Sequence, residues 1–101
     1  MEFKQLQEKI VQNALRYGKE FGVDIDKEFA TLKLVEEVGE FAQALLIHEK
    51  KSRPEKFLEE EKSKEELAKE LADVVGMAIV NAHLLGIDIE SALEKKWISK
   101  E

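Results

Sequence analysis

The sequence predicts a single all-α domain, and three observations lead to this fold class. Apolar residues recur at spacings of three and four along almost the whole chain, which is the period of one helix face. Only one Pro and five Gly interrupt the 101 residues. Hydrophobic residues make up 44% of the chain, which is ordinary for a globular protein. We therefore expect one domain over residues 1–101, a four-helix bundle that dimerisation completes because so small a core is marginal alone.

The first two helices follow from their apolar stripes and their end signals. A stripe over residues 3–21 predicts the first helix, and Gly22 ends it. Asp24 or Asp26 can cap the second helix, because a short side-chain oxygen accepts hydrogen bonds from the free N–H groups of the first turn. The apolar pattern then continues to about Lys51.

A polar connection over residues 52–62 separates the second helix from the third. Ser63 and Glu66 have the spacing of a capping box, in which each side chain accepts from a backbone N–H group at the helix start. The third helix is therefore expected to begin at Ser63 and to end before Gly86, which suits a left-handed C-terminal cap. Asp88 can then cap a short fourth helix.

Composition narrows the class of function. Twenty-two acidic residues against 16 basic ones give a net charge of −6, which disfavours a nucleic acid polymer as the partner. The chain has no Cys, so that oxygen and imidazole are the remaining metal ligands. The N-terminus lacks the apolar stretch of a signal peptide, and no run of 18 apolar residues occurs. We expect a cytoplasmic protein that does not bind a membrane.

Two acidic clusters lie inside apolar runs on the second and third predicted helices. Glu37 and Glu40 are three positions apart, as are Glu70 and Asp73, so each pair shares one face of its helix. If the helices pack antiparallel, the four carboxylates meet, and a divalent cation relieves their repulsion. This all-oxygen set favours Mg²⁺, with Mn²⁺ as a substitute. Gly39, between the first pair, costs about 1 kcal/mol relative to Ala and is expected to permit close approach of a helix or ligand.

The acidic residues resemble a known pattern, in which Glu36, Glu37 and Glu40 are followed about 30 residues later by Glu70 and Asp73. This pattern is that of the MazG-like all-α nucleoside triphosphate pyrophosphohydrolases. The similarity extends through three segments, which are residues 32–42, 70–75 and 84–89. It implies a MazG-like bundle that hydrolyses a nucleoside triphosphate to the monophosphate and pyrophosphate, as nucleotide-pool house-cleaning. It also implies homodimers or dimers of dimers.

Carried over position by position, the resemblance assigns Glu37, Glu40, Glu70 and Asp73 to the metal. It assigns catalysis to Glu36 and Glu37, with Glu36 holding or activating the attacking water. The chemistry is coherent, because a divalent cation lowers the pKa of a bound water and neutralises phosphate charge. A carboxylate nearby can then orient or deprotonate that water.

Three further residues are candidates for binding the substrate. Lys33 and Asn81 lie within two turns of the predicted metal ligands, although a surface lysine and a core-edge amide are the alternatives. The resemblance implies that Lys96 meets phosphate, whereas Lys100 stands where relatives carry an Asn, so contacts from the tail are not expected to carry over. Four aromatic residues can stack on a base, although most are expected in the core or a subunit interface. They are Tyr17, Phe21, Phe41 and Trp97.

Other interpretations of the same residues stay open. His48, near the end of the second helix, is expected to face solvent, and His83 receives no role. A carboxylate-bridged di-iron bundle would carry Glu-x-x-His pairs, whereas Glu37 and Glu70 are followed at that spacing by acids. The main alternative to an enzyme is a non-catalytic helical module that dimerises and binds metal.

Overall fold

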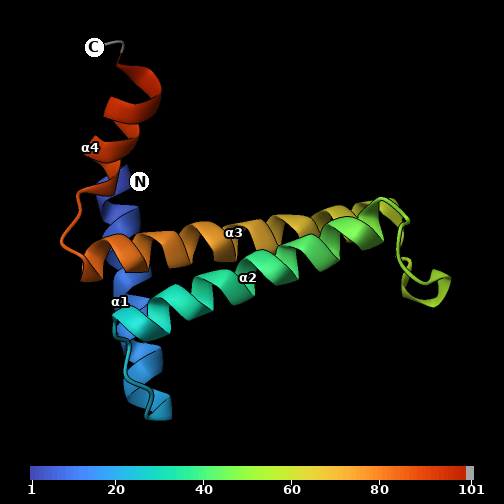
Figure 1. The fold of residues 1–101 in the computed structure, drawn as a ribbon, viewed down its shortest axis with the longest axis horizontal. Coiled ribbons are helices and arrows are strands. Elements are labelled where there is room, and N and C mark those ends of the chain that lie inside the picture. Colours follow the sequence, from blue (N-terminus) through green and yellow to red (C-terminus); the bar gives the residue numbers. More distant parts are fainter. Residues whose placement is uncertain (100–101) are drawn as a thin grey trace.

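The computed structural model describes residues 1–99, and these form helices with no strand among them (Figure 1). The α-helices are α1 (Phe3–Phe21), α2 (Lys27–His48), α3 (Glu60–Leu84) and α4 (Ile89–Leu93). Two short turns complete the chain, namely the 3-10 helix η1 (Pro54–Lys56) and the π-helical turn η2 (Glu94–Ile98). The predicted all-α fold is confirmed. The predicted tail residue Lys100 lies outside the described residues.

The corner between α1 and α2 depends on glycines. Gly22 ends α1 in the left-handed region with φ 67°, as its position in the sequence predicts. Gly18, one turn earlier, is buried against the returning chain. A Cβ atom on Gly18 would lie 2.6 Å from the carbonyl oxygen of Val23 and 2.5 Å from Cγ1 of Ile25. Only glycine therefore fits this close approach.

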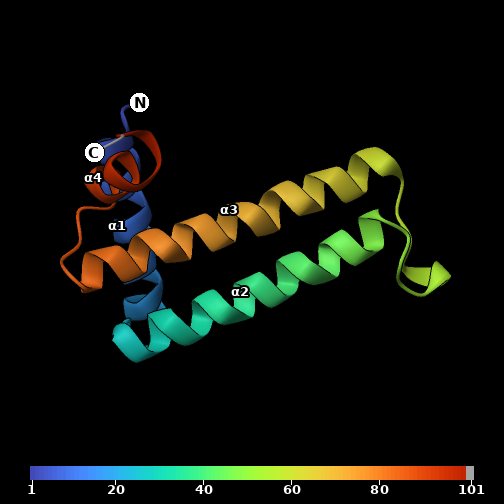
Figure 2. The same cartoon turned by 45° about the horizontal axis from the view of Figure 1, so that its top comes forward.

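Helices α2 and α3 lie side by side and run antiparallel, and α1 crosses one end of the pair (Figures 1 and 2). Asp26 caps α2, because its Oδ1 accepts from the N–H of Phe29 at 2.8 Å. Asn81 of α3 donates from Nδ2 to the carbonyl oxygens of Ala30 at 2.9 Å and Met77 at 2.7 Å. Ala30 is 0% exposed, so this amide ties the two helices together at a fully buried position.

The start of α3 differs from the prediction, because the helix begins at Glu60 rather than Ser63. The capping box of Ser63 with Glu66 is therefore wrong, and Ser63 lies buried inside the helix with its hydroxyl donating to the carbonyl oxygen of Glu60 at 3.0 Å. Acidic side chains in the first turn complement the helix dipole and favour the earlier start. His48, which ends α2, is half-buried with Nδ1 2.6 Å from Ser63 Oγ, so its predicted solvent-facing position is also wrong.

The C-terminal segment returns to the beginning of the chain. Gly86 has φ 68°, and Asp88 caps α4 by accepting from the N–H of Ser91 at 3.1 Å, as the sequence predicts. The Lys4 ammonium lies 3.1 Å from the same Asp88 carboxylate. This contact holds the first turn of α1 beside α4, as Figure 1 shows.

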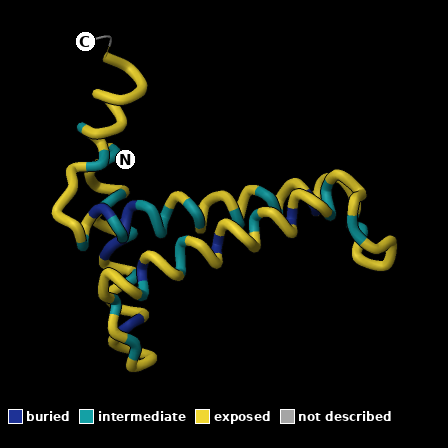
Figure 3. Tube along the Cα trace, in the orientation of Figure 1, coloured by how far each residue is buried: buried dark blue, intermediate teal, exposed yellow. Residues whose placement is uncertain are grey.

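The single chain has a thin core. Figure 3 shows buried positions as isolated stretches along the helices. The radius of gyration is 16.0 Å, whereas about 13 Å is typical of a compact domain of this length. Large apolar side chains of α2 stay exposed, among them Leu32 at 61% and Val35 at 64%. No single helix among residues 1–99 is long and apolar enough to cross a membrane; only α3 taken with Ile89–Ile98, across a 113° bend, reaches that length and hydropathy.

Candidate metal centre

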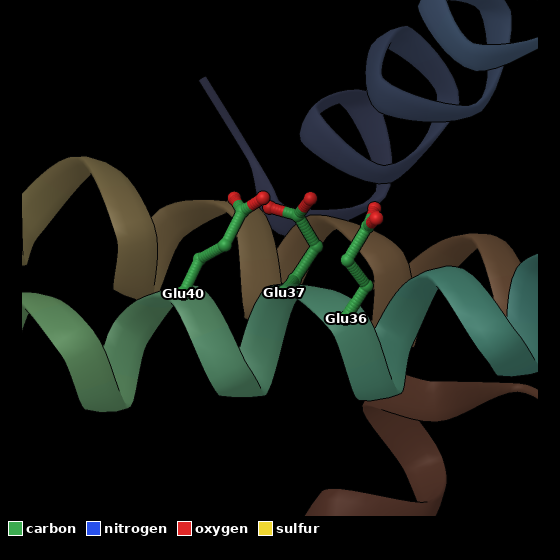
Figure 4. Close-up of side chains that lie close together, drawn as sticks. All are labelled: Glu36, Glu37 and Glu40. Atoms are coloured by element: carbon green, nitrogen blue, oxygen red, sulfur yellow. The ribbon is translucent and has the colours of Figure 1, made fainter.

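The acidic side chains of α2 and α3 converge between the two helices. The carboxylates of Glu36, Glu37 and Glu40 offer oxygens that lie within 4.8 Å of one another, and so do those of Glu37, Glu70 and Asp73. Figure 4 shows the three α2 side chains pointing to the same side of their helix. Because Glu37 belongs to both groups, its carboxylate is the centre of the cluster. The structure thus brings together the five acids that the sequence singles out.

Burial makes this cluster costly without a cation. Glu37 is only 5% exposed, and neither its Oε2 nor that of Glu70 has a hydrogen-bond partner within the described part of the chain. Burial raises the pKa of Glu37, and the adjacent carboxylates of Asp73 and Glu40 raise it further. Burial also raises the pKa of Glu70, again with help from Glu40 and Asp73. A buried carboxylate oxygen without a hydrogen-bond donor is energetically unfavourable, and a bound cation would remove that cost.

Lys33 is the cation that the structure itself places at the cluster. Its ammonium lies 2.6 Å from Glu36 Oε1 and 3.7 Å from Glu37 Oε1. The hydrogen bond with Glu36 raises the pKa of Lys33, so the lysine stays charged. One ammonium cannot balance five carboxylates, and the centre keeps a strongly negative potential.

The donor set fits Mg²⁺. Both groups consist of carboxylates alone, from two rigid helices, which is the hard oxygen chemistry that Mg²⁺ and Mn²⁺ prefer. Within residues 1–99, neither His48 nor His83 belongs to a candidate metal group. A di-iron centre with Glu-x-x-His ligands therefore finds no support in this arrangement. The residues that would hold the ion are Glu37, Glu40, Glu70 and Asp73.

The three candidate substrate-binding residues fall in different places. Lys33 lies at the cluster, as described above. Asn81 uses both amide hydrogens within the protein, and its Oδ1 accepts from the Thr31 hydroxyl at 3.3 Å, so the structure gives this side chain a packing role. Lys96 is exposed in η2, in a segment that Figure 1 shows extending away from the middle of the α2 and α3 pair. Of the three, Lys33 alone lies with the acids in the described chain.

A cavity of about 600 Å³ adjoins the acidic cluster and was not predicted from the sequence. Glu37 and Asp73 line it together with Lys33, so that it opens directly onto the candidate metal centre. Its walls come from α1, α2 and α3, and its volume is that of a small-molecule site. Of the predicted stacking residues, Tyr17 lines it. In the sequence, only the four-residue spacing of Asn13 and Tyr17 on α1 pointed to this cavity, and the same spacing is equally typical of an exposed helix face.

Comparison with known proteins gives one match. Residues 19–96 match the family model described as phosphoribosyl-ATP pyrophosphohydrolase. The searches of curated proteins and of solved structures gave no match. All five acids of the cluster fall inside the matched range, whereas most of α1, which forms one wall of the cavity, precedes it.

Proposed function

The chain belongs to the phosphoribosyl-ATP pyrophosphohydrolase family, and from that premise we propose that it hydrolyses a nucleoside triphosphate to the monophosphate and pyrophosphate with Mg²⁺. Membership of this family makes the chain a hydrolase of a pyrophosphate bond in a nucleotide. The observation that carries the finer proposal is the buried Glu37 carboxylate, which both acidic groups share and which keeps an unpartnered oxygen among the described residues.

Four carboxylates hold the cation in this proposal. Glu37 and Glu40 approach from α2 and Glu70 and Asp73 from α3, so the rigid helix pair fixes their separation before the ion arrives. When bound, the cation supplies positive charge against the phosphate oxygens. The burial of Glu37 strengthens that electrostatic interaction, because the site is partly shielded from water.

Glu36 is proposed to handle the proton of the attacking water. It is more exposed than Glu37, lies at the edge of the cluster, and is oriented by its 2.6 Å contact with Lys33. The water oxygen forms a new bond to phosphorus as the bridge between the α and β phosphates breaks, and pyrophosphate leaves with the bridging electrons. Glu36 accepts one proton of the water, and the other stays on the nucleoside monophosphate. The contact with Lys33 orients the Glu36 carboxylate for that transfer.

Self-association is part of the proposal, as a homodimer or a dimer of dimers. The exposed apolar side chains of α2, such as Leu32 and Val35, give two copies of the chain a surface to bury, which would complete the four-helix bundle. Lys96 is proposed to meet phosphate in that assembly, because its own segment extends away from the acids of the same chain. A cytoplasmic role in nucleotide-pool house-cleaning belongs to the same proposal.

Phosphoribosyl-ATP is the second candidate substrate, and the family match favours it. It carries the same triphosphate, so the same carboxylates would serve. The test is the release of pyrophosphate and orthophosphate from ribonucleoside and deoxyribonucleoside triphosphates and from phosphoribosyl-ATP, with and without Mg²⁺.

Three variants give this assay its controls. Glu40→Gln and Asp73→Asn each remove one proposed ligand, and both are expected to abolish pyrophosphate release. Glu65→Gln changes an exposed acid of α3 outside the cluster and should behave like the wild type. If the wild type releases pyrophosphate from none of these substrates, the non-catalytic metal-binding module is favoured. Unchanged turnover in both ligand variants would overturn the assigned site.

A further inference from the structure

We propose that the cavity between α1, α2 and α3 binds the nucleobase of the substrate, and that Asn13 reads a hydrogen-bond acceptor on the edge of that base. This inference rests on the proposed function and adds a preference to it, for a base with a keto oxygen over one with an amino group at the same ring position. The residues of α1 that carry it lie before the range of the family match.

The cavity extends from the metal centre along the two antiparallel helices. On α2, Phe29, Lys33 and Glu37 follow one another at four-residue spacing and all line the cavity. On α3 the lining runs from Asp73 to Val80 in the opposite direction. The acidic end therefore lies about 12 Å, or two helical turns, from the Phe29 end. A triphosphate held at the centre would leave its nucleoside to occupy the far part of the cavity.

The far part is built for a planar apolar group. Apolar and aromatic side chains dominate its lining, among them Ile10, Tyr17 and Phe29. The Tyr17 ring also contacts Phe21, with 4.9 Å between ring centroids. Every nucleobase offers a π-face to such a surface, whereas a phosphate would lose its hydration there.

A second cavity borders the cluster on its other side and is a poorer base site. Its volume is about 330 Å³, and its lining includes Glu40, Glu66 and Glu70. These carboxylates would repel the phosphates that must follow the base into the centre. The larger cavity instead places the Lys33 ammonium beside the metal centre, where the phosphates would lie.

The orientation of the Asn13 amide is fixed by its neighbour. Arg16 Nη2 donates to Asn13 Oδ1 at 3.1 Å. Because a guanidinium group has donors only, the amide oxygen must face Arg16, and the Nδ2 end with its two hydrogens points elsewhere. Asn13 lines the cavity and Arg16 does not, so Nδ2 is the end available to a ligand. Lys9 on the same wall is also a donor, and both groups select an edge that accepts.

The test compares bases that differ only at that edge. We expect wild-type kcat/KM in Mg²⁺ to be higher for UTP than for CTP and for ITP than for ATP, by about tenfold for one hydrogen bond to the base. Asn13→Asp replaces the donor end with an acceptor of the same shape and should reverse the order within each pair. Asn13→Leu should abolish the preference. A wild-type preference for the amino bases, or an unchanged order in Asn13→Asp, would overturn the assignment.

Binding of nucleoside monophosphates separates this inference from the proposed hydrolysis. Calorimetric titration of UMP and CMP needs no turnover, and the order of their affinities should also reverse in Asn13→Asp. Reversed binding without pyrophosphate release would leave the base site standing and reject the proposed reaction. Hydrolysis that neither Asn13 variant changes would support the proposed reaction and reject the base site. Absence of both binding and hydrolysis would overturn the two together.

Discussion

The carboxylates of Glu37 and Asp73 lie within 4.8 Å of each other across the α2 and α3 pair, although the chain has turned back on itself between them. Two helices thus confront each other through acids at a place where most helix pairs bury apolar side chains. The arrangement opposes the stability of the metal-free chain and offers a site that could hold a cation. Both the stability of the metal-free chain and its response to a cation can be measured.

Magnesium should stabilise the folded protein. A ligand at one hundred times its Kd that binds only the folded state adds about 2.7 kcal/mol, which corresponds to a rise in Tm of at least about 10 °C for a chain of this size. Differential scanning calorimetry in MgCl₂ and in chelator measures the rise. Asp73→Asn should lose it and Glu65→Gln should keep it. An equal rise in both variants would place the ion elsewhere.

Glu37 and Glu70 should make the metal-free protein less stable as the pH rises above 4.5. The pKa values of Glu37 and Glu70 are raised above the ordinary 4.5, so the folded state holds protons that the unfolded state has lost. This contribution to the free energy of unfolding is fully present below 4.5 and is lost as the pH rises through the raised values. Thermal unfolding in chelator across this range measures it. Glu37→Gln should flatten the dependence, and a curve parallel to the wild type would contradict it.

Glu37→Gln should also make the metal-free protein more stable at neutral pH. The substitution keeps the shape of the side chain and removes the charge that burial and Asp73 oppose. Chemical denaturation in chelator is expected to show a higher midpoint than the wild type, together with loss of the Mg²⁺ effect. A lower midpoint would mean that the Glu37 charge is compensated within the chain.

Two glycines give a matched test of the packing. Gly18→Ala should destabilise the protein by about 1–3 kcal/mol, because the new methyl group would meet Val23 and Ile25. Gly39→Ala should stabilise it by up to about 1 kcal/mol, since no described atom beyond the neighbouring backbone of α2 lies within 4 Å of the new Cβ. Free energies of unfolding from urea titrations compare the two. Stabilisation by Gly18→Ala would contradict the described corner between α1 and α2, and destabilisation by Gly39→Ala would contradict the open space described beside Gly39.

Self-association should depend on the apolar face of α2. Sedimentation equilibrium is expected to give a multiple of the 11.6 kDa chain mass. Val35→Glu places a charge on a side chain that is 64% exposed in one chain and should shift the protein towards the monomer. Gln12→Glu adds the same charge on exposed α1 and should not. A monomeric wild type would contradict the proposed dimer.

Much of the fold and of the acidic cluster could be predicted from the sequence because both depend on local periodicity. Three-residue spacing alone places Glu37 with Glu40 and Glu70 with Asp73, and antiparallel packing of consecutive helices brings the pairs together. The role of Asn81 could not be decided from the sequence, because its spacing from Asp73 suits substrate binding as well as a hydrogen bond between helices. Gly39 was expected to admit a close neighbour, which the described chain does not provide.

What could not be predicted depends on contacts between distant segments. Ser63 lies inside α3 because it is buried against His48 of α2, and this contact between two helices has no local pattern in the sequence. The cavity beside the cluster needs the crossing of α1 over the helix pair, which periodicity does not determine. For that reason the sequence did not indicate a role for Asn13, whose amide orientation follows from its contact with Arg16 in the structure.

Titration with Mn²⁺, followed by electron paramagnetic resonance, tests most directly whether the paired acids of α2 and α3 form a divalent-cation site. The wild type is expected to bind Mn²⁺ in competition with Mg²⁺, Glu65→Gln to bind it equally, and Glu37→Gln to lose it. Failure of the wild type to bind the ion, or equal binding by Glu37→Gln, would contradict the central role given to Glu37.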